Sequence, residues 1–333
     1  MRIFDLEEEK LKREIMKLEA KKVLLQLPEG LKPEAPRLAK LIQKLGAMPI
    51  ISADPCYGAC DLALQDAEAL GADLIVHFGH TKMLKHERIP TLYIEARANL
   101  NIEKPVKKAL ALLKDYKKIG LATTVQHIHM LENAKELLLE ADKTVAVGDA
   151  GCLPYAGQVT GCNYSNVKAV KKEVEAFLFL GGGHFHAIGV ELASGKPTVV
   201  ADPYEKRTFT VEKETKRIIS QRWAAIEEAK EAKNIGIIIG LKTGQKRTEE
   251  AEKIKEKLVK AGKNAFLLAL REITPETLMQ FPTLEAYVNT ACPRVGFDEA
   301  SKFLKPVLTP EELAVMLGEK SWEKLCSGGW FGN

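Results

Sequence analysis

The chain has 333 residues, of which 46% are apolar and 28% are charged, and its formal net charge is +4 at pH 7. This length exceeds what one hydrophobic core usually covers, so we expect two or three folded domains. Charges of both signs are interleaved along the sequence, which excludes the basic stripe typical of nucleic-acid-binding proteins. The composition therefore predicts a folded protein without a nucleic-acid partner.

The distribution of apolar residues indicates in which cellular compartment the protein is expected. The first ten residues are charged where a secretory signal would be apolar, and the longest apolar runs, such as residues 235–241, are too short to span a bilayer. These features predict a cytoplasmic protein without a membrane partner. In that reducing compartment, six cysteines rarely form structural disulfides, and no pair has CxxC spacing. Most of them are expected to be small buried hydrophobes.

Strands and helices alternate in the N-terminal part of the chain. An opening amphipathic helix places Leu11, Ile15 and Leu18 on one face and precedes a buried strand at 23–27. The next predicted elements are a helix carrying Leu38, Ile42 and Leu45, a strand at 48–52, a helix at 61–70, and strands at 73–78 and 91–94. Strands joined by helical crossovers pair in parallel, so this segment predicts a layered α/β domain.

The same order of elements begins again at two later points. First strands are predicted at 23–27, 119–123 and 235–240, so roughly 100 residues separate successive starts, which is the size of a domain. The later strands are predicted at 144–147, 176–180, 197–201, 264–268 and 285–290, and the helices between them at 128–139, 166–175, 187–193, 211–233 and 248–261. A capping box at Thr309 and Glu312 opens the last helix. We therefore predict three similar Rossmann-like α/β domains with parallel sheets, at residues 1–103, 104–209 and 210–333.

Each predicted domain carries one cysteine on a loop that follows a strand: Cys60, Cys162 and Cys292. Ligands of open parallel sheets bind beyond the carboxyl ends of strands, so an internal triplication that aims the three loops at one centre would form a central metal site. Iron-sulfur clusters normally take four ligands, and three thiolates would leave one iron open to a substrate. The spacing alone leaves two alternatives open, which are incidental buried cysteines and a local redox pair of Cys56 with Cys60.

Two glycine-rich segments follow strands in the second predicted domain. In the loop at 147–164, Gly151, Gly157 and Gly161 allow the backbone to approach a ligand closely. The segment GGGHFH at 181–186 is either a tight strand-to-helix turn or a nest for a phosphate or carboxylate, and it lacks the GxGxxG spacing of a dinucleotide site. The sequence contains neither a P-loop nor a GxSxG elbow, which disfavours nucleotide hydrolysis and an α/β-hydrolase.

Seven motifs, taken together, resemble one known family. They occur in every predicted domain, and their order and spacing make the resemblance specific although each motif alone is weak. The motifs are LPEGL at 27–31, YGACD at 57–61, FGHT at 78–81, GQVTGCN at 157–163, GGGHFH at 181–186, ADPY at 201–204 and NTACPR at 289–294. With these motifs the chain resembles the archaeal diphthamide-synthesis iron-sulfur 3-amino-3-carboxypropyl transferases.

The resemblance implies a homodimer in which each subunit holds a 4Fe-4S cluster through one cysteine per domain. Carried over by motif, the cluster ligands are Cys60, Cys162 and Cys292. The other cysteines lie outside the motif positions and are expected to be structural: Cys56, Cys152 and Cys326. Members of the family cleave the Cγ–S bond of S-adenosylmethionine, giving methylthioadenosine and a 3-amino-3-carboxypropyl radical that attacks C2 of a histidine in translation elongation factor 2. The implied activity is the first step of diphthamide biosynthesis, and it requires an electron donor.

Residues near the implied cluster are expected to bind S-adenosylmethionine. The glycines after a strand offer backbone N–H groups to its carboxylate or ribose. The candidate cofactor-binding residues are Gly181, Gly182, Gly183, His186 and Asp202. Arg294 follows a ligand cysteine closely and is the candidate for pairing with the carboxylate.

Two other functions remain open from the sequence. A quinolinate-synthase-like dehydratase is also built from three α/β repeats with one cluster cysteine each, and it uses the open iron as a Lewis acid. The motifs GQVTGCN and ADPY favour the transferase instead. A non-catalytic, cluster-bearing subunit that serves a partner enzyme is the second alternative, but three motif cysteines in one chain favour a catalyst.

Overall fold

The computed structural model divides the chain into two compact units. The first unit comprises Met1–Leu100 with the segments Val125–His129 and Lys242–Gly244, and the second unit comprises the rest. Both units are mixed α/β structures with mainly parallel sheets, which confirms the predicted fold class. The residues that the structure describes are 3–84, 87–298 and 300–331. Within these ranges, no helix is long and apolar enough to cross a membrane.

The first unit contains a four-stranded sheet in the order β3-β2-β4-β5, and all its neighbouring strands are parallel. The strands are β2 (Lys22–Gln26), β3 (Met48–Ile51), β4 (Leu74–Phe78) and β5 (Thr91–Ile94). The helices are α1 (Glu8–Lys17), α2 (Ala35–Lys44) and α3 (Leu64–Leu70). A short antiparallel pair joins β1 (Phe4–Asp5) to β6 (Arg97–Ala98). The predicted alternation of strands and helices is therefore present.

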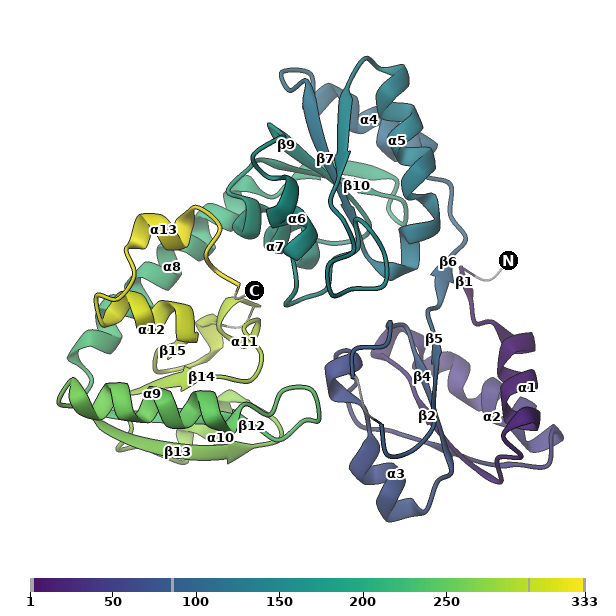
Figure 1. Ribbon diagram of the computed structural model, residues 1–333, viewed down its shortest axis with the longest axis horizontal. Helices are drawn as coiled ribbons and strands as arrows, with labels where there is room; N and C mark the ends of the chain where they lie inside the picture. Colours follow the sequence, from purple (N-terminus) through teal and green to yellow (C-terminus); the bar gives the residue numbers. More distant parts are fainter. Residues whose placement is uncertain (1–2, 85–86, 299, 332–333) are drawn as a thin grey trace. The chain divides into compact units, whose positions relative to one another are not determined.

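Alternate residues of the strands pack on opposite faces of this sheet. Val23 and Leu25 belong to the core that α1 and α2 cover, whereas Leu24 belongs to the core under α3. Figure 1 shows α1 and α2 on one side of the sheet and α3 on the other. Parallel strands need helices on both faces, because both faces are apolar.

Two predicted details of the first unit are wrong. Leu18 is 44% exposed rather than buried, because α1 ends at Lys17 and the chain turns at Glu19, whose φ is positive. The helix predicted from residue 61 begins at Leu64 instead. The residues before it, Ala59–Asp61, form a 3-10 turn that belongs to the loop carrying Cys60.

The second unit contains two sheets, with the orders β8-β7-β9-β10-β11 and β13-β12-β14-β15. The strands are β7 (Lys118–Thr123), β8 (Thr144–Val147), β9 (Ala176–Leu180), β10 (Thr198–Asp202), β11 (Arg207–Thr210), β12 (Asn234–Gly240), β13 (Asn264–Leu270), β14 (Ala286–Asn289) and β15 (Val307–Leu308). The helices are α4 (Glu103–Leu112), α5 (Leu131–Glu140), α6 (Ser165–Val170), α7 (Phe185–Ser194), α8 (Glu212–Glu231), α9 (Thr248–Lys260), α10 (Pro275–Met279), α11 (Val295–Asp298), α12 (Pro310–Met316) and α13 (Trp322–Cys326).

The three large sheets share one strand order. In each sheet, the strand that comes second along the chain lies at one edge, next to the strand that comes first. The third and fourth strands along the chain follow on the other side of the first. A repeated domain produces such a common order, and the division near residues 103 and 209 remains our prediction. Strand β11 was not predicted, and it pairs antiparallel with β10 as the only antiparallel neighbour in the described part of these sheets.

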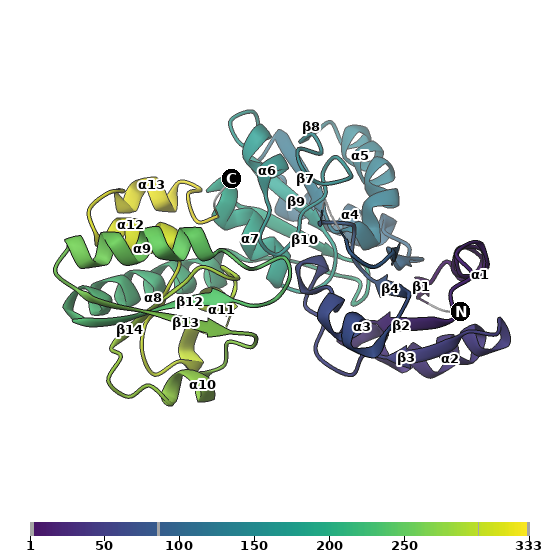
Figure 2. The same cartoon turned by 60° about the horizontal axis from the view of Figure 1, so that its bottom comes forward.

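One continuous apolar core joins both sheets of the second unit. It includes Phe177 from β9, Ile237 from β12, and Trp330 and Phe331 from the C-terminal tail. Helices α8, α12 and α13 pack side by side (Figure 2), and the ring centroids of Trp223 in α8 and Trp322 in α13 lie 4.8 Å apart. The tail thus contributes to the core of this unit.

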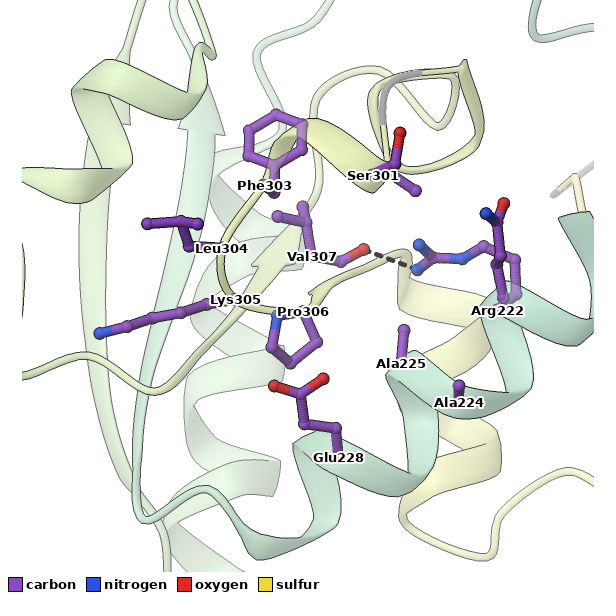
Figure 3. Close-up of a pocket in the computed structure, with 12 residues that line it drawn as sticks. Arg222, Ala224, Ala225, Glu228, Ser301, Phe303, Leu304, Lys305, Pro306 and Val307 are labelled. Carbon is purple, nitrogen blue, oxygen red and sulfur yellow. Dashed lines mark hydrogen bonds between the residues drawn. The ribbon is translucent and has the colours of Figure 1, made fainter.

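A buried ion pair connects α8 to α12. Arg222 and Glu312 have side chains that are 2% and 0% exposed, and Nε and Nη2 of Arg222 donate to the two carboxylate oxygens at 2.6 and 2.8 Å. The guanidinium also donates to the carbonyl oxygens of Gly296 at 2.8 Å and Val307 at 2.6 Å, and Figure 3 shows the bond to Val307. This one side chain therefore fixes four segments of the second unit.

Replacing Glu312 with Gln should lower the free energy of unfolding by about 3–5 kcal/mol, because the charge of Arg222 would stay buried without its carboxylate. Gln keeps an oxygen that can accept from the backbone N–H of Thr309, so the cap of α12 is retained. Glu212, which pairs with Lys216 on the exposed face of α8, is the matched control, and Glu212→Gln should change stability by less than about 0.5 kcal/mol. Urea unfolding followed by tryptophan fluorescence measures both. Equal losses in the two variants would contradict the special contribution of the buried pair.

Candidate metal centre

The Cys60 loop, residues 52–63, leaves the carboxyl end of β3 in the first unit. The carbonyl oxygen of Cys60 accepts the backbone N–H of Gly244 at 2.7 Å, and a Cβ at position 244 would lie 2.6 Å from the Cα of Cys60. Beside it, the ammonium of Lys242 contacts the carboxylate of Asp61 at 3.0 Å. Only glycine allows this close approach of two backbones, and the contact fixes the position of Cys60.

The Cys162 loop, residues 148–164, leaves the carboxyl end of β8 in the second unit. It returns alongside β7, where the backbone N–H of Val159 donates to the carbonyl of Thr123 at 2.8 Å. The hydroxyl of Thr160 lies 3.9 Å from the sulfur of Cys162. The side-chain amide of Asn163 donates to the sulfur of Cys152 at 2.8 Å. The loop is therefore ordered by its own backbone and polar side chains, and Cys162 lies at its far end.

The Cys292 loop, residues 290–294, leaves the carboxyl end of β14. The side chain of Asn289 spans it, because Nδ2 donates to the carbonyl of Cys292 at 2.6 Å while Oδ1 accepts the N–H of Ala291 at 2.9 Å. After the loop, the carbonyl of Gly296 accepts from Arg222. The buried ion pair of α8 and α12 thus anchors the chain directly after Cys292.

Arg294 joins three parts of the second unit. Its Nη2 donates to the carbonyl of Phe185 at 2.9 Å, and its guanidinium lies 3.8 Å from the centroid of the Phe185 ring. A Cβ at Gly161 would lie 3.0 Å from the same ring and 3.7 Å from Cγ of Arg294. The Cys162 loop, the start of α7 and the Cys292 loop therefore converge in this unit.

The glycine turn, residues 181–184, connects β9 to α7. Gly183 has a φ of +73°, and a Cβ at Gly182 would lie 2.9 Å from the ring of Tyr204. The carboxylate of Asp202 accepts the backbone N–H groups of Tyr204 at 2.8 Å, Glu205 at 3.1 Å and Gly183 at 3.4 Å. Asp202 therefore holds the turn in place. His186 lies in the first turn of α7 with its ring against Phe179 and Phe185.

The six cysteines differ in their surroundings. All six lie in the described part of the chain, and none of them is in a disulfide. Cys60, Cys162 and Cys292 are partly exposed, and each lies on a loop beyond a parallel strand. Cys56 is buried, and burial raises the pKa of its thiol to about 12. Burial also raises the pKa of Cys326. Three accessible thiols on loops suit a cluster that takes three protein thiolates, whereas Cys56 would stay protonated in the absence of a cation.

A cavity of about 220 Å³ lies elsewhere in the second unit, between α8 and residues 300–307 (Figure 3). Arg222 and Glu228 from α8 and Phe303, Leu304 and Lys305 from the loop line it. No cysteine or histidine is among its twelve lining residues, so it offers none of the chemistry expected of a metal centre.

The comparisons with known proteins agree on one family. The family described as putative diphthamide synthesis protein matches residues 27–326, a range that contains all three cysteine loops. A 2-(3-amino-3-carboxypropyl)histidine synthase from Pyrococcus horikoshii is 38% identical over 308 residues, covering 92% of this chain and 88% of the relative. The human 2-(3-amino-3-carboxypropyl)histidine synthase subunit 1 is 32% identical over 93% of this chain and 71% of the relative.

A solved structure gives the same result. The crystal structure of Dph2 from Pyrococcus horikoshii with a 4Fe-4S cluster matches with a TM-score of 0.89 and 35% identity, covering 98% of this chain and 95% of that chain. The family predicted from the seven motifs is thereby confirmed. The chain belongs to the family of diphthamide synthesis proteins.

Proposed function

We propose that this chain transfers the 3-amino-3-carboxypropyl group of S-adenosylmethionine to C2 of a histidine imidazole in translation elongation factor 2, the first step of diphthamide biosynthesis. The observation that carries the proposal is the 38% identity, over 92% of the chain, to the 2-(3-amino-3-carboxypropyl)histidine synthase of Pyrococcus horikoshii. The predicted enzyme class, a transferase, is confirmed by this relative and by the human one. We further propose a cytoplasmic homodimer that receives electrons from a separate donor.

Cys60, Cys162 and Cys292 are the residues that would hold a 4Fe-4S cluster. Their support is the chemistry of the donor set, since these are partly exposed thiols and each predicted domain supplies one of them on a loop beyond a parallel strand. When bound, the cluster would supply the electron for reductive cleavage of the Cγ–S bond and an iron without a protein ligand. The three-domain arrangement around a central site belongs to the same proposal.

The residues of the second unit would bind and orient the cosubstrate. Gly182 is exposed at the turn, where its backbone N–H would face a carboxylate or ribose, whereas the N–H of Gly181 already donates to the carbonyl of Ala201 at 3.1 Å. His186 follows in α7. Arg294 would supply positive charge to the carboxylate from the side of the Cys292 loop. Asp202 contributes indirectly, since its carboxylate already accepts backbone N–H groups of the turn. Small changes in this orientation would alter which carbon–sulfur bond breaks, because reactivity depends steeply on alignment.

The identity of the ligand cysteines gives a first prediction. Changing Cys60, Cys162 or Cys292 singly to Ala should reduce the iron content to background and abolish transfer, since each removes one of three ligands. Cys152→Ala is the matched control, because Cys152 is an exposed cysteine outside the ligand set and its loss should leave iron bound. Iron analysis of anaerobically purified variants measures the effect. The assignment is wrong if Cys152→Ala loses iron while one of the three is dispensable.

The product of cofactor cleavage gives a second prediction. The reduced protein given S-adenosylmethionine without elongation factor 2 should form methylthioadenosine together with aminobutyrate or its dimer, because the Cγ–S bond is the one expected to break. Chromatography with mass detection identifies the nucleoside. Predominant 5′-deoxyadenosine would reject the aminocarboxypropyl mechanism, and no cleavage by a protein with a full cluster would favour a dehydratase or an accessory subunit.

Arg294 gives a third prediction. Arg294→Ala should raise the dissociation constant of S-adenosylmethionine roughly tenfold or more while iron content is retained, because a charge-assisted hydrogen bond to the carboxylate is lost. Arg294→Lys keeps the positive charge, so its dissociation constant for S-adenosylmethionine should lie between those of the wild type and Arg294→Ala. Equilibrium dialysis and iron analysis on the same samples separate the effects. Loss of iron in Arg294→Ala would instead assign Arg294 to holding Phe185 and the Cys292 loop.

A further inference from the structure

Three side chains with metal-binding atoms meet in the first unit, apart from the cysteines proposed as cluster ligands. They are Cys56, His77 and His80, and their ligand atoms all lie within 4.8 Å of one another. Cys56 is 2% exposed and His77 is 0% exposed. The two histidines come from the end of β4 and the turn after it, and Cys56 comes from the loop after β3. Because β3 and β4 flank β2 in a parallel sheet, both segments lie at the same edge of it.

The hydrogen bonds around Gln26 determine which nitrogen of His77 carries a proton. Gln26 Nε2 donates to the carbonyl of Asp61 at 2.6 Å, and Gln26 Oε1 accepts the N–H of Ala63 at 3.1 Å, so the orientation of the amide is fixed. Oε1 lies 2.9 Å from Nδ1 of His77, which must therefore be the donor. The lone pair of His77 is then on Nε2, the atom that lies 3.0 Å from Nδ1 of His80. Histidines that bind metals are oriented in this way, by an acceptor on the nitrogen opposite the ligand atom.

The spacing of the two histidine nitrogens is close to that on a bound ion. Two imidazole nitrogens on one tetrahedral zinc ion lie about 3.3 Å apart, since each zinc–nitrogen bond is about 2.0 Å long. The observed 3.0 Å between the two rings is a hydrogen-bond distance, and it needs to increase by only a few tenths of an ångström. A small rotation of His80, which lies on a turn rather than in the strand, is enough.

The protonation states also suit a cation. Burial lowers the pKa of His77 well below its usual value and that of His80 to about 4, so both rings are neutral near pH 7. Burial, together with the nearby carboxylates of Asp61 and Glu29, raises the pKa of the Cys56 thiol to about 12. A bound divalent cation would displace that proton, so binding forms one metal–sulfur and two metal–nitrogen bonds and releases one proton.

We propose that Cys56, His77 and His80 form a second metal site, which takes a divalent ion of the zinc class. One thiolate and two imidazoles suit zinc, whereas calcium and magnesium prefer oxygen ligands. Three protein ligands leave a fourth position for water. Through Cys56, which lies four residues before Cys60, the ion would connect the Cys60 loop to the end of β4. It would thus stabilise the loop without taking part in transfer. The inference does not depend on the proposed function.

The test measures zinc directly on the full-length protein with its iron-sulfur cluster reconstituted. The protein is given one equivalent of zinc sulfate, passed over a desalting column, and analysed for zinc and iron. We expect about one zinc per chain, with a zinc K-edge absorption spectrum of one sulfur at about 2.3 Å and two or more nitrogen or oxygen atoms at about 2.0 Å. Iron does not interfere at the zinc edge. A triple variant, Cys60→Ala/Cys162→Ala/Cys292→Ala, should retain the zinc because it keeps all three proposed ligands.

The variants Cys56→Ser and His80→Ala should lose the zinc, and Cys152→Ser should retain it as a control with a cysteine removed elsewhere. Zinc should also raise the unfolding temperature of the wild type and leave that of Cys56→Ser unchanged, because only a ligand that binds the folded state stabilises it. Zinc that survives in both Cys56→Ser and His80→Ala would overturn the proposal, as would a shell of three or four sulfurs or no zinc above background in the wild type. If Cys56→Ser fails to fold, the wild-type spectrum and the triple variant still decide. Loss of transfer activity with zinc retained would concern the proposed function alone.

Discussion

The guanidinium of Arg222 is the interaction on which the architecture of the second unit depends. It pairs with the carboxylate of Glu312. Its orientation is tightly constrained, because its hydrogen bonds to Glu312, Gly296 and Val307 come from three different nitrogen atoms. A buried arginine is costly unless its charge and donors are compensated, and here one carboxylate and two backbone carbonyls accept four hydrogen bonds from it. The carbonyl of Gly296 lies four residues after Cys292. The same contact that joins two helices therefore limits the movement of a loop that carries a proposed cluster ligand.

The regular part of the fold was predictable because its strands are continuous apolar runs. Strands β4 and β9 are buried at every position, and their predicted bounds agree with the observed ones to within one residue. Strand β11 was missed because RTFT is short and contains no apolar run, and its position is set by pairing with β10. The burial of Arg222 was also missed. The helix α8 is rich in charges of both signs, and no local pattern indicates that one of them meets a carboxylate ninety residues later.

In the candidate site, too, features with a local sequence motif were predictable, whereas contacts between distant segments were not. The motifs identified the cysteines on loops because each loop has a recognisable sequence of its own. Asp202 was predicted to lie beside the cofactor, and the structure adds that its carboxylate accepts backbone N–H groups at the glycine turn, an interaction that depends on how the chain returns after β10. The cluster of Cys56, His77 and His80 was not expected at all. Its members follow two different strands, and they meet only because β3 and β4 lie on either side of β2.

The contact between Gly244 and Cys60 has a consequence for the order in which the protein matures. The two residues are separated by most of the second unit's sequence, yet the hydrogen bond between them is part of the first unit. During synthesis on the ribosome, the sheet of β2 to β5 is complete long before Lys242–Gly244 emerges from the exit tunnel. The loop around Cys60 therefore reaches its final form late, after translation has passed residue 244. The cluster that we propose at Cys60 would then be inserted only after residue 244 has emerged, and the nascent N-terminal part alone would be a poor acceptor for iron and sulfide.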